Sequence, residues 1–157
     1  MEKMKHLPGE WVFENFIVGT SNKFAHAAAV AVANGCNTHS YNPLIIYGAS
    51  GLGKSHLLHA IYNSVVTGNP QLNVIITNAS AYVNDLVEAI KKDDFENFHK
   101  KYSSADFLLI DDTHILSRKQ ATQREFFMTL DSLINADKQV VCTCTFSEDD
   151  HYGEICV

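Results

Sequence analysis

One stretch, residues 48–55, constrains the fold of this chain more than any other. It reads GASGLGKS and matches the pattern G-x-x-x-x-G-K-[S/T] at every fixed position. An apolar run that ends at Tyr47 precedes it, and apolar residues at helical spacing follow it from His56 onward. A strand, a glycine-rich turn and a helix in this order are the setting in which such a loop binds phosphate. The sequence therefore predicts a phosphate-binding loop, and the alternative is a glycine-rich turn capped by Ser55.

The residue types of this loop suit the phosphates of a nucleotide. Gly48, Gly51 and Gly53 carry no Cβ where the chain has to turn tightly and approach phosphate closely. Lys54 can reach the β- and γ-phosphates, and the hydroxyl of Ser55 can bind Mg²⁺. The backbone N–H groups and the N-terminus of the following helix add partial positive charge. We therefore predict that the loop binds a nucleotide with Mg²⁺.

A pair of acids provides the second half of such a site. The apolar run 107–110 ends on Asp111 and Asp112, which alternatively only begin a polar loop. A carboxylate at the end of a buried strand can hold Mg²⁺ or its water, and its neighbour can polarise an attacking water. Ligands of parallel sheets bind at the carboxyl ends of the strands, so both motifs are expected at one edge. We predict Lys54, Asp111 and Asp112 as catalytic residues, and Ser55 and Asp111 as Mg²⁺ ligands.

The rest of the chain alternates short apolar runs with helical patterns, which predicts an α/β fold with parallel strands joined by helices. Strands are expected at 44–47, 73–77, 107–110 and 140–144. Helices are expected at about 22–34, 56–67, 79–102 and 122–135, and Asp93-Asp94 is expected to divide the third of them.

The pattern also indicates an apolar helix face and a set of core residues. In the first helix a common apolar face is formed by Phe24, Ala27, Ala28 and Ala31. The predicted core residues are Phe16, Leu44, Ile46, Leu58, Ile61, Val74, Ile76, Leu108, Ile110, Phe127, Leu130 and Val141.

Length and composition indicate one ordinary domain. The chain has 157 residues, of which 46% are hydrophobic, enough to bury a core. No apolar stretch approaches the roughly 18 residues that span a bilayer, and the first residues do not resemble a secretory signal. We expect a soluble, cytoplasmic protein with an N-terminal extension at 1–11, a core at 12–146 and an acidic tail at 147–157.

The formal net charge of −6 does not favour binding of nucleic acid by the domain as a whole. Local basic patches remain candidates, although each is also explained as a solvated helix face. These patches are Lys91-Lys92, Lys100-Lys101 and Arg118-Lys119.

The cysteines allow one further alternative. Cys142 and Cys144 are two apart in a predicted strand and face the same side, so a zinc site could be drawn with His151 and Cys156. The spacing matches no common zinc motif, and intracellular thiols are the favoured interpretation.

Several separated motifs together resemble one family. They are residues 13–28 (FENFIVGTSNKFAHAA), 41–44 (YNPL), 51–61 (GLGKSHLLHAI), 108–112 (LLIDD) and 122–127 (TQREFF). In this order they resemble the AAA+ ATPase domain of the bacterial replication initiator DnaA, and the resemblance runs from about Val12 to Val141. It implies a three-layer αβα phosphate-loop fold with strands in the order 1-4-3-2.

The resemblance also implies ligands and partners. Ile17, Val18 and Gly19 would line an adenine pocket, with Asn22 nearby. The nucleotide-binding residues predicted for ATP or ADP are Ile17, Val18, Gly19, Asn22, Gly48, Gly51, Leu52, Gly53, Lys54, Ser55 and His56. Single-stranded DNA would contact Lys91, Lys92, Lys100, Lys101 and Lys119, and the partners would be further copies or the full-length initiator.

This chain departs from the family pattern in places. Ser55 stands where the family usually has threonine, and Thr113-His114 where it often has Ile-Gln. The residue that senses the γ-phosphate would be Thr143 or Thr145. No match extends to the family's arginine finger, lid, helix-turn-helix or helicase-interacting domain, so the chain is a fragment or a shortened relative. We therefore expect ATP binding with very slow turnover and no specific recognition of duplex DNA.

Two other functions remain open at this stage. One is a helicase loader or an initiator regulator that acts on a protein partner. The other is a degenerate nucleotide-binding module.

Overall fold

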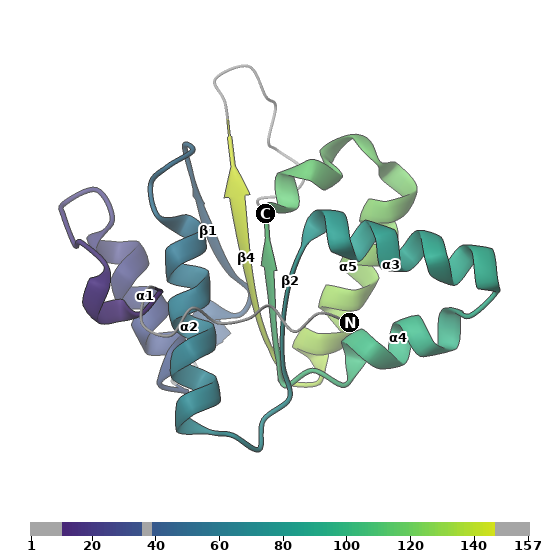
Figure 1. Ribbon diagram of the computed structural model, residues 1–157, viewed down its shortest axis with the longest axis horizontal. Coiled ribbons are helices and arrows are strands. Elements are labelled where there is room, and N and C mark those ends of the chain that lie inside the picture. The colour runs from purple at the N-terminus through teal and green to yellow at the C-terminus, as the bar shows by residue number, and fades with distance from the viewer. Residues whose placement is uncertain (1–10, 36–38, 147–157) are drawn as a thin grey trace.

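The fold is built around one sheet of four parallel strands (Figure 1). The computed structural model describes residues 11–35 and 39–146. The strands are β1 (Leu44–Gly48), β2 (Val74–Asn78), β3 (Phe107–Asp111) and β4 (Gln139–Thr145). They lie in the order β1-β4-β3-β2, which confirms the predicted fold class and strand order.

Helices cover both faces of this sheet. They are α1 (Lys23–Ala33), α2 (Lys54–Gly68), α3 (Ala79–Lys92), α4 (Phe95–Ser103) and α5 (Gln120–Asn135). Figure 1 shows α1 and α2 on one side of the sheet and α3, α4 and α5 on the other. Three short 3-10 helices complete the described elements: η1 (Phe13–Asn15), η2 (His39–Tyr41) and η3 (Thr113–Arg118). The result is the predicted three-layer αβα arrangement.

Each face of the sheet has its own hydrophobic core. Ile46, Leu109 and Val141 pack with α1 and α2, whereas Leu108 and Ile110 pack with α3, α4 and α5. Because side chains alternate along a strand, consecutive residues of β3 serve opposite cores. This explains why β3 is apolar from Phe107 to Ile110 and does not alternate with polar residues.

The predicted core is confirmed in part. Buried as predicted are Ile46, Leu58, Ile61, Leu108, Ile110, Leu130 and Val141. Only partly buried are Phe16, Leu44, Val74 and Ile76, which pack at the edge of the α1–α2 core. The prediction for Phe127 is wrong: it is 36% exposed, and its neighbour Phe126 is buried instead. Consecutive residues of a helix point about 100° apart, so tertiary packing had to decide between them.

The apolar face expected for α1 is not the face that the fold buries, except at Ala28. Phe24 is 77% exposed, Ala27 is exposed as well, and Ala31 is only half-buried. The residues that are buried instead are Ala28, Ala29, Val32 and Ala33. The helix thus presents its small side chains to α2 and the sheet, which lets the elements approach closely.

The division of the helical stretch 79–102 is confirmed. Asn78 caps α3 by accepting a hydrogen bond from the N–H of Ala81 at 2.8 Å. Asp93 then adopts a left-handed conformation with φ 51° and ends α3. Asp94 caps α4. Asp93 thus stops one helix through its backbone conformation, and Asp94 starts the next because its side chain accepts a hydrogen bond from the N–H of Asn97.

Two further expectations concern a membrane span and a zinc site. Within residues 11–35 and 39–146, no helix combines the length and hydrophobicity needed to cross a bilayer. Cys142 and Cys144 are buried in β4, whereas His151 and Cys156 of the zinc alternative lie outside the described residues. No cluster of three or more potential metal-ligating His, Cys, Asp or Glu side chains occurs in the described part.

Candidate functional site

The glycine-rich loop joins the end of β1 to the start of α2, as predicted. Gly51 and Gly53 have φ values of 80° and 89°, in the left-handed region that side chains other than glycine disfavour. A Cβ atom added to Gly53 would lie 2.8 Å from Cε2 of Phe16. Glycine is therefore required at position 53 for two reasons, its backbone conformation and the ring packed against it.

Lys54 is the buried cation of this loop. Lys54 is the first residue of α2 and is only 8% exposed. Its Nζ donates a hydrogen bond to the carbonyl oxygen of Ala49 at 2.6 Å. A neutral carbonyl is a weak partner for a buried ammonium group, whereas a phosphate oxygen would form a charge-assisted hydrogen bond. The loop thus holds a cation ready for an anionic ligand.

Asp111 connects three elements at the carboxyl edge of the sheet. Its Oδ2 accepts a hydrogen bond from Oγ of Ser55 at 2.7 Å, and its Oδ1 accepts one from Oγ1 of Thr143. The phosphate loop, β3 and β4 therefore meet at one carboxylate, which is the juxtaposition that the two sequence motifs predict. A hydroxyl and a carboxylate are hard oxygen ligands, and Mg²⁺ prefers such ligands.

Asp112 turns the chain away from β3. Its φ of 58° is left-handed, and its N–H donates to Oγ1 of Thr143 at 3.0 Å. Thr113 then donates its hydroxyl to the carbonyl oxygen of Thr143 at 2.9 Å. Thr143 is fully buried, so its hydroxyl is committed to the two aspartates. The sequence left Thr143 and Thr145 as equal candidates for the sensing residue, and it did not indicate the role of Thr113.

A short N-terminal segment packs over the start of α2. The ring of Phe16 stacks on His26 at 5.7 Å between centroids and meets the edge of His56 at 5.3 Å. Nε2 of His56 hydrogen-bonds to the carbonyl oxygen of Val12 at 2.8 Å. The imidazole of His56, predicted at the nucleotide, is thus engaged with this segment.

The residues predicted to line an adenine pocket come next in the sequence, directly after Phe16. Asn22 closes the turn there, since its Nδ2 donates to the carbonyl oxygen of Ile17 at 3.0 Å and its Oδ1 accepts from the N–H of Gly19 at 2.8 Å. Ile17 is 88% exposed and Val18 is 48% exposed. Asn22 therefore orders a turn that presents apolar side chains to the solvent. Leu52 in the loop is exposed too.

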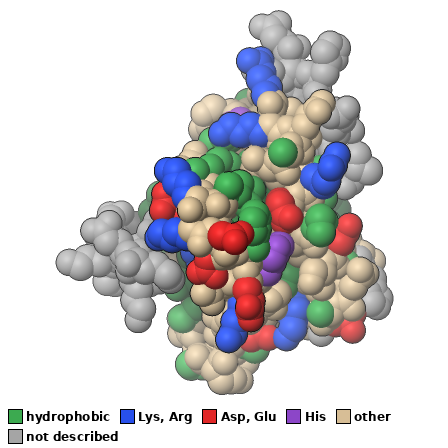
Figure 2. Space-filling model, turned by 90° about the vertical axis from the view of Figure 1, so that its right-hand side faces the viewer, with side chains coloured by type: hydrophobic (Ala, Val, Ile, Leu, Met, Phe, Trp, Pro, Cys, Tyr) green, Lys and Arg blue, Asp and Glu red, His purple; other side chains and the backbone are tan. Residues whose placement is uncertain are grey.

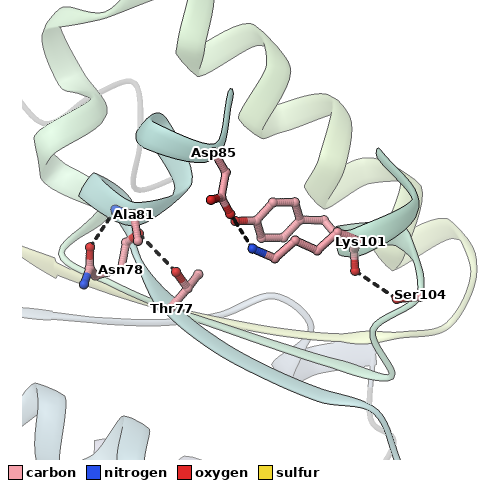
Figure 3. A network of polar contacts seen from close by, with 7 residues as sticks. Thr77, Asn78, Ala81, Asp85, Lys101 and Ser104 are labelled. Atoms are coloured by element: carbon pink, nitrogen blue, oxygen red, sulfur yellow. Dashed lines mark hydrogen bonds and ion pairs between the residues drawn. The ribbon is translucent and has the colours of Figure 1, made fainter. Parts of the chain in front are cut away.

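The lysines predicted to contact DNA differ in their surroundings. Lys101 donates to Asp85 at 2.5 Å across the α3–α4 pair, and Figure 3 shows its ammonium directed at that carboxylate. Lys91 and Lys92 lie 3.4 and 3.5 Å from Glu88, and their proximity lowers the pKa of this carboxyl group. Figure 2 shows acidic side chains interspersed with basic ones on this face.

The other two lysines of the predicted set are less constrained. Lys100 and Lys119 are exposed, and neither forms an ion pair with another residue of the described ranges. These two are the lysines whose charge stays available to an external anion.

This parallel sheet, with a glycine-rich loop and an acidic strand end at one edge, defines a phosphate-loop NTPase domain of the AAA+ class. Residues 7–150 match the family described as the Bacterial DnaA ATPase domain, and the chain belongs to this family.

Individual relatives agree with this assignment. The chromosomal replication initiator protein DnaA of Chloroflexus aurantiacus is 47% identical over 131 residues, which are 83% of this chain and 27% of the relative. The crystal structure of domain III of the Thermotoga maritima DnaA matches with a TM-score of 0.84 at 42% identity, over 88% of this chain and 57% of that one. A structure of DnaA bound to AMPPCP and single-stranded DNA matches with a TM-score of 0.81 at 35% identity, over 89% of this chain and 43% of that one. The chain thus spans less than a third of its curated relative.

The helicase-loader alternative shares only the fold. A crystal structure of the DnaC helicase loader matches with a TM-score of 0.70 but at 18% identity.

Proposed function

We propose that this domain binds ATP or ADP together with Mg²⁺. The observation that carries the proposal is the convergence of Lys54, Ser55 and Asp111 at the edge of the sheet, where the ammonium, the hydroxyl and the carboxylate come from two motifs 56 residues apart. Nucleotide-bound DnaA structures at 35% identity support it. Lys54 would exchange its contact with the carbonyl of Ala49 for the phosphates.

The oxygen ligands present fit Mg²⁺. Ser55 and Asp111 would hold the ion, which supplies charge neutralisation of the phosphates when bound. Thr143 would keep the carboxylate of Asp111 oriented, because it donates to the oxygen that Ser55 does not use. Asp112 would polarise the attacking water, and its short reach would make this step slow.

The adenine would be bound by the turn at residues 17–19. Ile17 and Val18 expose apolar surface that a base would cover, and Asn22 keeps the turn in place. Covering apolar surface stabilises a complex by roughly 25 cal/mol per Å². We propose that the base binds here and the phosphates at the loop.

We further propose that the domain serves replication initiation through nucleotide-controlled assembly with further copies on DNA, in the cytoplasm. The DnaA relative that is bound to AMPPCP and single-stranded DNA supports this. Lys100 and Lys119 would contribute most to contacts with the phosphates of single-stranded DNA. Lys91, Lys92 and Lys101 would contribute less, because each would have to break its ion pair with an acidic side chain.

Hydrolysis by this domain is expected to be slow. Asp112 is one methylene shorter than glutamate, and its backbone is fixed by the hydrogen bond to Thr143. The carboxylate therefore has little freedom to reach a water molecule at the γ-phosphate.

Calorimetric titration with ATP in the presence and absence of Mg²⁺ tests the nucleotide site. We expect Mg²⁺ to strengthen binding in the wild-type chain and to have a smaller effect in Ser55→Ala, which lacks the hydroxyl ligand. Ser64→Ala on the same helix is the matched control. An equal effect of Mg²⁺ in all three chains would contradict the proposed metal ligand.

Fluorescence anisotropy of a labelled oligothymidylate tests the DNA proposal. With AMPPCP bound, Lys100→Ala is expected to weaken binding more than Lys91→Ala, whose lysine is paired with Glu88. Equal affinities with and without nucleotide would contradict nucleotide control.

A further inference from the structure

The end of β4 extends past the end of its neighbour β3. The pairing of β3 with β4 runs to Ile110 opposite Cys142, whereas the pairing of β1 with β4 continues to Gly48 opposite Thr145. The last residues of β4 therefore have a strand on one side only. Their backbone groups on the other side need partners from another element.

The 3-10 helix η3 provides these partners through side chains. Thr113 donates its hydroxyl to the carbonyl oxygen of Thr143 at 2.9 Å, and the N–H of Thr145 donates to Nδ1 of His114 at 3.2 Å. Two consecutive residues of η3 thus bond two alternate residues of β4. The segment that follows Asp112 and the end of β4 are joined as one unit.

The hydrogen bond makes the imidazole of His114 an acceptor. Nδ1 of His114 accepts the hydrogen of the Thr145 N–H, which requires a tautomer that leaves Nδ1 without a proton. His114 is half-buried, and its role here is that of an acceptor. A glutamine side chain also offers an acceptor oxygen, whereas alanine offers none.

The bonded residue, Thr145, lies at the edge of the sheet where the phosphate loop begins. It pairs with Gly48, the first residue of the phosphate loop, and so stands at the carboxyl edge of the sheet. The alternative candidate, Thr143, is fully buried and bonded to Asp111 and Asp112. Of these two threonines, Thr145 is therefore the one whose hydroxyl forms no hydrogen bond with a residue of the ranges 11–35 and 39–146.

We propose that His114 is a positioning residue, which holds Thr145 at the γ-phosphate end of the nucleotide site. This inference rests on the proposed nucleotide binding. It adds that His114 holds Thr145, the threonine that would sense the γ-phosphate, in position. His114 does not contact the nucleotide itself. It acts through the backbone of Thr145, so its effect depends on whether the γ-phosphate is present.

The test compares the wild-type chain with His114→Ala and His114→Gln, after circular dichroism has shown that each is folded. The ¹⁵N-labelled chains are titrated with Mg²⁺ and either AMPPCP or ADP, and the amide resonance of Thr145 is followed by NMR. In the wild-type chain we expect this resonance to shift differently with the two nucleotides. Loss of one hydrogen bond, worth about 1 kcal/mol, corresponds to a roughly fivefold weaker affinity for AMPPCP.

In His114→Ala the amide resonance of Thr145 is expected to shift equally with AMPPCP and ADP, and the affinity for AMPPCP is expected to fall. The affinity of this variant for ADP is expected to stay within about twofold of the wild-type value. His114→Gln is expected to retain the wild-type behaviour, because its oxygen replaces Nδ1 as acceptor. A purely structural role would weaken ADP and AMPPCP equally in His114→Ala, and this result would overturn the inference. An identical response of wild-type Thr145 to both nucleotides would overturn it too. Failure of the wild-type chain to bind either nucleotide would overturn the proposed function as well.

Discussion

Replacing Thr143 by valine isolates the polar network at the acidic strand end. Valine has nearly the same shape as threonine, so the change removes the hydroxyl without opening a cavity. The hydroxyl donates to Asp111 and accepts from the N–H of Asp112 at 3.0 Å, and the residue is fully buried. The variant therefore leaves one partly buried N–H without its acceptor and one carboxylate oxygen without its donor.

The expected loss of stability in Thr143→Val follows from these two groups. A buried N–H without a partner costs about 1–3 kcal/mol, and a hydrogen bond to a charged group contributes about 1.5–3 kcal/mol. Both aspartates are only partly buried, and Asp111 keeps its hydrogen bond from Ser55, so water offsets part of each loss. We expect Thr143→Val to lower the free energy of unfolding by about 2–4 kcal/mol.

Urea unfolding followed by circular dichroism measures this difference. With a denaturant slope of about 1–3 kcal/mol per M, the midpoint is expected to fall by about 1 M or more at an unchanged slope. Thr145→Val is the matched control, because the hydrogen bond of Thr145 to His114 uses its backbone N–H; its effect is expected to stay within about 0.5 kcal/mol. Equal midpoints for Thr143→Val and the wild-type chain would refute the reasoning.

Three further predictions concern other parts of the fold. Gly53→Ala is expected to lower the free energy of unfolding by about 2 kcal/mol or more, because φ is 89° and a Cβ would meet the ring of Phe16; an unchanged urea midpoint would contradict this. Burial raises the pKa of Tyr82 to about 12, so the stability it contributes is complete below about pH 10 and is lost as the pH rises toward 12; urea midpoints across this range should fall less steeply in Tyr82→Phe, and parallel curves would argue against it. Hydrogen bonds from Lys138 and a backbone N–H hold the pKa of Asp106 below its usual range, so its contribution is present above about pH 4 and is lost in more acidic solution; Asp106→Asn should flatten the acid limb of stability, and an acid limb as steep as that of the wild type would count against this ion pair.

Local patterns predicted the parts of the structure that depend on neighbours in sequence. The phosphate loop, the acidic strand end and the break at Asp93-Asp94 each follow from residue types within one short segment. Because parallel strands all end at one edge, the meeting of Ser55 with Asp111 also follows from the fold class. These features needed no knowledge of packing.

Features that depend on distant contacts were missed or wrong. The buried face of α1 could not be read from a helix rich in alanine, since several faces are equally apolar and contact with α2 decides. The pairing of Lys101 with Asp85 joins two helices, and no pattern of single residues indicates it. The contact of His114 with Thr145 depends on how far β4 extends beyond β3, which strand periodicity does not specify.

The central claim is that Lys54 and the loop around it bind the phosphates of ATP. Calorimetric titration of ATP with Mg²⁺ into the wild-type chain and Lys54→Ala tests it most directly, with Lys91→Ala as the control for loss of one exposed lysine. Removal of a charge-assisted contact of about 1.5–3 kcal/mol predicts a tenfold to hundredfold weaker affinity in Lys54→Ala and wild-type affinity in Lys91→Ala. Equal affinities of Lys54→Ala and the wild-type chain for ATP would contradict the account.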